Sequence, residues 1–131
     1  MSANNPYSVY KSNSVNYASK EQLLLMLVDG AVKYSKIGRQ ALVDNDMVKA
    51  HKHLVTTQEI FAELMASLDL SKSGEWGKQL MMVYDFIHTK LVEANIKKSV
   101  EILDSIIPLI EDIRDTWYEA EKLSKVQAQA K

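Results

Sequence analysis

The chain has 131 residues, of which 47% are hydrophobic and 25% are charged, values typical of one folded domain rather than of a disordered or fibrous chain. Sixteen Lys and Arg residues nearly balance seventeen Asp and Glu residues and are interspersed with them, so no net field favours nucleic acid or an anionic membrane as a partner. Cysteine is absent, which excludes disulfides, thiolate metal sites and thiol nucleophiles.

The first segment, residues 1–18, is rich in Ser and Asn without a helical period and predicts an extended N-terminal arm. It lacks the charged-then-apolar order of a secretory signal, and no apolar run in the chain approaches a membrane span. We therefore expect a protein that acts inside the cell without direct membrane binding. Tyr7 and Tyr10 stand three residues apart in this polar segment. They either anchor the arm over an apolar groove until a partner displaces it, or are incidental to a tail.

Four helices are predicted after the arm, because Gly and Pro are scarce and no strand-like alternation occurs. Ser19 and Gln22 form a capping-box pattern that starts the first helix, which runs to about Val43. Asp46 is the expected N-cap of the second helix, which we place as ending near Leu70.

The segment "SKSGEWG" at 71–77 predicts the break before a third helix over about residues 75–94. Asn95 is expected to adopt a left-handed conformation after it. The fourth helix should begin near Lys97 or Lys98 and fade into the polar tail.

Short turns between helices of similar length predict an all-α, antiparallel, up-down-up-down four-helix bundle. The expected organisation is the arm at 1–18, the bundle at 19–123 and the tail at 124–131. Pro108 lies on the polar side of the fourth helix and should bend it or open its backbone ladder locally.

Apolar residues exceed what one buried seam requires. The second helix has a single apolar side, formed by Met47, Ala50, Leu54, Phe61, Leu64, Met65 and Leu68. The first helix has a seam of Leu23, Leu27, Ala31, Tyr34 and Ala41. Its apolar surface continues beyond that seam over Leu24, Leu25, Val28, Val32 and Val43.

The third and fourth helices add to this surplus. Met82 and Phe86, at i and i+4, lie opposite the seam of the third helix, and Ile102 and Leu109 widen the apolar side of the fourth. We predict a groove for a partner segment, lined by Leu24, Leu25, Val28, Val32, Met82, Phe86, Ile102 and Leu109. Two alternatives stay open: the arm covers central first and fourth helices, or the chain dimerises.

Motifs for catalysis are weak. His51 and His53 point to different sides of a helix, and Asp85 with His88 supplies only one of the two carboxylate–histidine pairs that a di-iron site needs. "AHKHLV" resembles histidine phosphotransfer domains, although their Lys-Gly pair is missing. We expect no enzyme, metal or cofactor, and keep phosphotransfer as an alternative function.

An ordered set of segments resembles the FliS-type flagellar export chaperones over about residues 5–120: "NPYSVYKSNSV", "LLLMLVDGAVKY", "VYDFIHTKLVEANIKKSVEIL" and "IRDTWYEA". The resemblance implies a four-helix bundle in the bacterial cytosol. Such a chaperone binds the disordered C-terminal segment of flagellin, prevents premature polymerisation and keeps the segment competent for flagellar type III export.

The resemblance also implies details of the partners. Export-gate components and other flagellar regulators are further candidates, and the chain is expected to be a monomer or a weak dimer. Tyr7 and Tyr10 match arm tyrosines of the family, whose arm in some members occupies part of the groove when flagellin is absent. Val28 replaces a frequent aromatic residue, and Pro108 interrupts a helix that is usually continuous.

Overall fold

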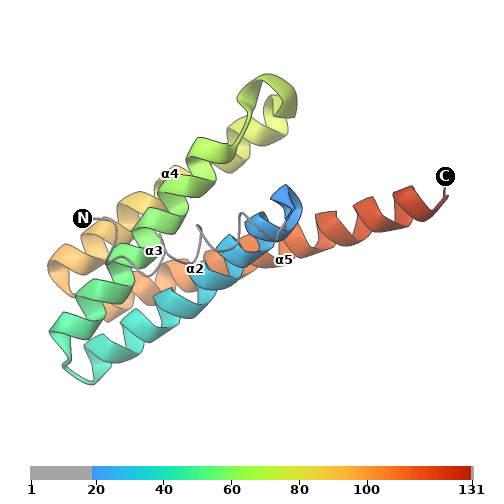
Figure 1. Ribbon diagram of the computed structural model, residues 1–131. Coiled ribbons are helices and arrows are strands. Elements are labelled where there is room, and N and C mark those ends of the chain that lie inside the picture. The colour runs from blue at the N-terminus through green and yellow to red at the C-terminus, as the bar shows by residue number, and fades with distance from the viewer. Residues whose placement is uncertain (1–18, 131) are drawn as a thin grey trace.

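The computed structural model describes residues 19–130, and in this part of the chain it contains four α-helices and no strand (Figure 1). They are α2 (Lys20–Val43), α3 (Met47–Ser67), α4 (Leu70–Lys97) and α5 (Val100–Ala130). This confirms the predicted all-α, four-helix fold. The predicted arm, with Tyr7 and Tyr10, lies outside the described residues.

The four helices form a ring in which each packs against two others. Helix α2 contacts α3 and α5, and α4 contacts the same two helices from the other side. The connections have only two or three residues, so consecutive helices reverse direction (Figure 1). The α2–α5 pair and the α3–α4 pair diverge toward the α3–α4 connection (Figure 1). Among residues 19–130, no helix is both long and apolar enough to cross a membrane.

Local capping sets the first two helix starts as predicted. Ser19 Oγ accepts a hydrogen bond from the Gln22 amide, and Gln22 Oε1 accepts one from the Ser19 amide, each at 3.1 Å. Asp46 Oδ1 accepts from the Lys49 amide at 3.2 Å and caps α3. These contacts satisfy backbone donors that have no partner inside a helix.

The break between α3 and α4 differs from the prediction. Helix α3 ends at Ser67, before the expected Leu70, and α4 begins at Leu70 rather than near residue 75. Asp69 caps this early start by accepting a hydrogen bond from the Ser71 amide at 3.0 Å. Within the break expected at 71–77, only Gly74 is non-helical, with a φ of 61° and a ψ of −143°.

The end of α4 also corrects a prediction. Asn95 is helical and buried, and the left-handed residue is Lys98, with a φ of 51°. The Lys98 ammonium donates to Asn95 Oδ1 at 2.6 Å, which leaves the Asn95 amide nitrogen facing His51 Nδ1 at 3.0 Å. The helix continues past Asn95 to Lys97, so the left-handed position falls on Lys98, whose amide donates to the Ala94 carbonyl.

Helix α5 is longer and more continuous than expected. It runs as one element from Val100 to Ala130, so the predicted polar tail is helical up to Ala130. Pro108 lies inside this helix and is exposed, in agreement with its predicted polar side.

The core draws large side chains from all four helices. Tyr84 is buried with its ring edge-on to Phe61 at a centroid distance of 6.0 Å, and its hydroxyl accepts a hydrogen bond from Trp117 Nε1 at 2.8 Å. Burial raises the pKa of Tyr84 to about 12. The tyrosine therefore serves as a neutral core residue with one satisfied polar atom.

Two predicted groove residues belong to this core. Val28 is 0% exposed and Val32 is 7% exposed, so the expectation that they form an exposed surplus on α2 is wrong. Leu24, Ile102 and Leu109 are half-buried and pack against the core.

The packing of α2 against two helices explains the error. A Cβ atom on Gly30 would lie 3.1 Å from Ile60 Cδ1, and one on Gly38 would lie 2.7 Å from Leu54 Cδ2. Helix α3 therefore lies against the glycine side of α2, which coincides with the predicted seam. Lys36 and Arg39, four and seven residues after Val32, pair with Glu111 and Asp104 of α5, so α5 covers the valine side of α2.

Candidate functional site

The outward side of α4 exposes apolar side chains as predicted. Met82 is 71% exposed and Phe86 is 49% exposed. Lys90 Nζ lies 5.9 Å from the Phe86 ring centroid and pairs with Glu93 at 3.2 Å. Hydrogen bonds from Lys97 and Lys90 lower the pKa of Glu93. We call Met82, Phe86, Lys90 and Glu93 the α4 outer face.

A tryptophan pair joins α4 to α5. The Trp76 ring meets the Trp117 ring edge-on at a centroid distance of 5.5 Å, and Trp76 is 49% exposed. By helical period Trp76 falls on the same side of α4 as the buried Tyr84 and Ile87. Its partial exposure follows from its position two residues after Gly74, where the helix is interrupted.

Trp117 also lines a pocket between α2 and α5 of about 110 Å³. This pocket, named the α2–α5 pocket, brings together Glu21, Leu24, Leu25, Trp117, Ala120, Glu121 and Ser124. Two predicted groove residues, Leu24 and Leu25, are therefore joined by an indole ring that the sequence did not single out. The lining is apolar with carboxylates at its edge, and Glu121 pairs with Lys125 at 2.8 Å.

Polar pairs hold α5 against α2 on the outside of the bundle. They are Tyr118 with Asp29, Lys36 with Glu111, and Arg39 with Asp104. The hydrogen bond that Tyr118 donates to Asp29 raises the pKa of Tyr118, and the bond from Arg39 lowers the pKa of Asp104. These contacts fix the two helices that form the α2–α5 pocket.

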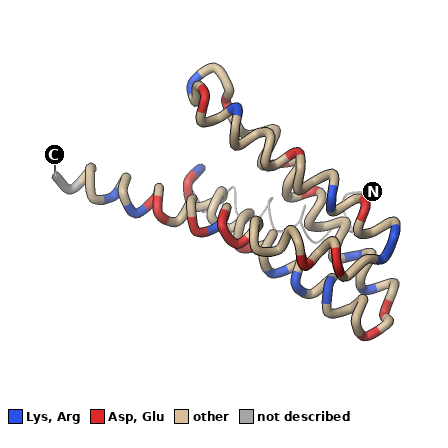
Figure 2. The backbone as a smooth tube through the Cα atoms, turned by 180° about the vertical axis from the view of Figure 1, so that it is seen from behind, with Lys and Arg blue, Asp and Glu red and all other residues tan. Residues whose placement is uncertain are grey.

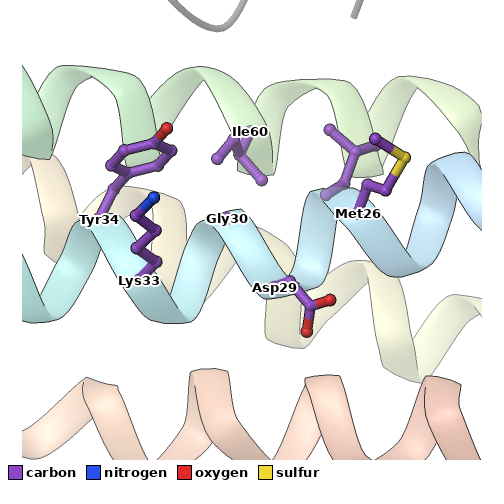
Figure 3. A pocket seen from close by; sticks show the side chains of 7 residues that line it. Met26, Asp29, Gly30, Lys33, Tyr34 and Ile60 are labelled. Atoms are coloured by element: carbon purple, nitrogen blue, oxygen red, sulfur yellow. The ribbon is translucent and has the colours of Figure 1, made fainter. Parts of the chain in front are cut away.

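A second pocket, of about 120 Å³, lies between α2 and α3 (Figure 3). This α2–α3 pocket is lined by Met26, Leu27, Asp29, Gly30, Lys33, Tyr34 and Ile60. The Lys33 side chain lies beside the Tyr34 ring, and the Asp29 carboxylate points away from both (Figure 3). The missing side chain at Gly30 helps to keep the pocket open.

The remaining predicted residues occupy other environments. Ile102 and Leu109 pack against the core and line neither pocket, and Val28 and Val32 are interior. The accessible members of the predicted groove thus divide between the α4 outer face and the α2–α5 pocket. Tyr7 and Tyr10 remain predictions, because they lie outside the described residues.

The two neighbouring histidines contact different helices. His51 faces Asn95 of α4, whereas His53 stacks on Tyr34 of α2 at a centroid distance of 5.6 Å. Within residues 19–130, no three His, Cys, Asp or Glu side chains converge as metal ligands. The described part of the chain therefore offers a partner apolar and ionic contacts along its helix surfaces.

Comparison with known proteins identifies the family. The family model described as "Flagellar protein FliS" matches residues 3–124. The flagellar secretion chaperone FliS of Bacillus subtilis is 34% identical over 120 residues, which cover 92% of this chain and 89% of that protein. The protein of the same name from Salmonella typhimurium is 30% identical over 106 residues, which cover 80% of this chain and 78% of that protein. The one from Vibrio cholerae is 28% identical over 112 residues, which cover 82% of each chain. The chain therefore belongs to the FliS family of flagellar secretion chaperones.

Proposed function

We propose that this chain binds the disordered C-terminal segment of flagellin in the bacterial cytosol, prevents its premature polymerisation and keeps it competent for flagellar type III export. Membership of the FliS family over residues 3–124 carries this proposal. Export-gate components and other flagellar regulators are candidate further partners.

The exposed apolar surface supports the proposal physically. A segment that orders on binding loses conformational entropy, so the chaperone must offer a large contact rather than one small pocket. The α4 outer face and the α2–α5 pocket lie on different helices, and a segment that wraps the bundle can use both. Met82 suits this role because a thioether side chain adapts to irregular partners.

The residues proposed for direct contact are the accessible members of the predicted groove. They are Leu24 and Leu25 in the α2–α5 pocket, and Met82 and Phe86 on the α4 outer face. The other four predicted residues, Val28, Val32, Ile102 and Leu109, support this surface from within.

Calorimetry with a C-terminal flagellin fragment tests the proposal. We expect one-to-one binding and a gain of helicity in the fragment by circular dichroism. Leu25→Glu and Met82→Glu should each weaken binding by at least about tenfold, because each places a charge in an apolar contact. Val48→Glu is the matched control, since Val48 is 84% exposed outside both surfaces. Absence of binding to the unmodified chain would overturn the proposal.

The arm is proposed to cover part of this surface until the client displaces it. Deletion of residues 1–15 should then strengthen fragment binding, because the client no longer competes with an intramolecular segment. Unchanged affinity would remove this role of Tyr7 and Tyr10 and leave the chaperone function intact.

A further inference from the structure

A polar network links α3 to α4 at the end of the bundle that carries the α2–α3 and α4–α5 connections (Figure 1). His51 lies in the second turn of α3 and is exposed, whereas Asn95 lies in the last turn of α4 and is buried. The Asn95 amide nitrogen is 3.0 Å from His51 Nδ1, and Asn95 Oδ1 accepts a hydrogen bond from the Lys98 ammonium at 2.6 Å. We call these three side chains the His51–Asn95–Lys98 network.

Lys98 fixes the direction of both hydrogen bonds in this network. An ammonium group carries donors and no acceptor, so it can face only the carbonyl oxygen of Asn95. The amide nitrogen of Asn95, which is a donor, is therefore turned toward His51, and His51 Nδ1 must accept. Since only an unprotonated ring nitrogen accepts, the network requires a neutral His51 with its proton on Nε2.

Protonation of His51 is incompatible with this arrangement. It places an N–H donor on Nδ1 opposite the NH₂ group of Asn95, and two donors cannot form a hydrogen bond with each other. A half-turn of the Asn95 amide gives its oxygen to the imidazolium, but it also turns the amide nitrogen toward the ammonium of Lys98. Two cations thus compete for one amide oxygen, so protonated His51 and the Lys98–Asn95 hydrogen bond exclude each other.

No carboxylate relieves this competition. In the described part of the chain, His51 forms no ion pair within 4.0 Å, and Glu93 of α4 is held by Lys90 and Lys97. Helix α5 does not pack against α3. Figure 2 shows Lys and Arg beside Asp and Glu along all four helices, so local contacts rather than a net field act on His51.

The other neighbours of His51 are uncharged or cationic. The residues one turn away on α3 carry no charge; they are Met47, Val48, Leu54 and Val55. Helix α2 meets α3 on the opposite side, where Tyr34, with Lys33 beside its ring, stacks on His53. The charged residues that adjoin His51 are therefore Lys52, the next residue in the sequence, and Lys98.

Lys98 forms the turn between α4 and α5. Its φ of 51° is left-handed, which is uncommon for a residue other than glycine. Its amide and the Ser99 amide both donate to the Ala94 carbonyl, and Ser99 Oγ accepts from the Ile102 amide at 3.2 Å at the start of α5. The Lys98 ammonium ties this turn to Asn95, so its release should loosen the α4–α5 connection.

We propose that the His51–Asn95–Lys98 network is a pH-sensitive switch, in which protonation of His51 turns the Asn95 amide and releases Lys98 from the α4–α5 connection. Because His51 is exposed, protons from solvent reach it without opening the core. The switch is independent of the proposed function, since every group in it belongs to this chain.

Amide hydrogen exchange of the ¹⁵N-labelled full chain tests the switch at about pH 7.5 and about pH 5.0, on either side of the ordinary imidazole value of about 6.5. Protection of the Ser99 amide is corrected for the intrinsic rate and expressed relative to the Tyr84 amide, which reports the general stability of the bundle. This ratio should fall about threefold or more in acid, as expected for the loss of one hydrogen bond. The Asn95 side-chain amide signals should shift over the same pH range as the His51 ring signals.

His51→Gln is the matched control, because a glutamine carbonyl accepts from Asn95 at both pH values and does not titrate. The ratio should then be the same at both. Lys98→Met removes the ammonium, so the ratio should already be about threefold lower at about pH 7.5 and should not fall further in acid. Equal ratios at the two pH values in the unmodified chain would overturn the switch. An acid loss that persists in His51→Gln, or undiminished protection in Lys98→Met, would overturn it as well.

Discussion

Gly30 and Gly38, eight residues apart on α2, both face α3 but have different room for a side chain. A Cβ atom on Gly38 would lie 2.7 and 2.9 Å from two atoms of Leu54, which is fully buried. At Gly30 the contact is 3.1 Å to the end of the Ile60 side chain, which lines the α2–α3 pocket and has space to shift. The two glycines should therefore respond differently to alanine.

Gly38→Ala should lower the free energy of unfolding by about 1 kcal/mol, because overpacking costs about 1–3 kcal/mol and exceeds the ~1 kcal/mol helix propensity gained. Gly30→Ala should leave stability unchanged or raise it by up to about 1 kcal/mol, since propensity dominates where the neighbour can move. Urea denaturation of both variants measures these changes. Equal effects at the two positions would show that α3 does not approach α2 as described.

The acid dependence of stability contains a contribution from His53. Its pKa is lowered in the folded chain, by burial first and then by Lys52, Lys49 and Lys33, from an ordinary value of 6.5. Between the folded pKa and 6.5, the unfolded chain binds more protons, so stability is lost as the pH falls through this window. Above 6.5 the contribution is fully present.

His53→Phe removes this titration while keeping a ring against Tyr34. The variant should lose less stability than the unmodified chain between about pH 7.5 and about pH 5.5, measured by urea denaturation at both values. All other residues are the same in both proteins, so their contributions cancel in the comparison. An unchanged pH dependence would refute the assignment to His53.

For single residues, contacts between positions close in the sequence could be predicted, whereas contacts between distant positions could not. The cap made by Ser19 and Gln22 is local and was predicted correctly. The environment of Asn95 was not predicted, because its side-chain amide faces His51, which is 44 positions away in the sequence. A pattern read over one helix cannot detect a partner on another.

Pro108 is the least favourable residue within α5. It cannot donate the backbone hydrogen bond to the carbonyl of Asp104, and its side chain is exposed. Proline costs about 3 kcal/mol relative to alanine in a helix interior, while it stabilises by about 0.4–1 kcal/mol through the unfolded chain.

Pro108→Ala should therefore raise the free energy of unfolding by about 2–2.5 kcal/mol, measured by urea denaturation. Asp112→Ala, at an exposed position one turn later, is the control for helix propensity. A loss of stability in Pro108→Ala would mean that the proline shapes the packing of α5 against Lys36 and Arg39, with which it lines a shared hollow.

The four helices could be predicted from the sequence, but the buried side of α2 could not. Met82 and Phe86 were placed correctly, because α4 has an ordinary apolar seam opposite them. Val28 and Val32 were misplaced, because α2 packs against α5 as well as α3, and a projection of α2 alone does not show the second neighbour. Trp117 was missed as a pocket residue since its position on α5 fits the core equally well.

The four-helix bundle could be predicted from the scarcity of turn residues and from helical periodicity. The position of its exposed apolar surface could not, because it depends on how the helices pack. Val43, Met47 and Val48 lie around the α2–α3 connection, Met82 and Phe86 lie along α4, and Leu123 and Val126 lie near the end of α5. A stable homodimer needs one contiguous patch of roughly 1,000 Å² or more in total. This dispersed pattern favours a wrapped client over a second copy of the chain.

We therefore expect the chain, at low micromolar concentration, to show by light scattering the mass of one 14.9 kDa protomer. Phe86→Glu should leave this mass unchanged and weaken binding of the flagellin fragment, because Phe86 is half-exposed on the α4 outer face. Val126→Glu, at a more exposed apolar position on α5, should change neither quantity. A doubled mass that persists on dilution and is halved by Phe86→Glu would instead assign the α4 outer face to a homodimer, since the same side chain cannot serve both interfaces at once.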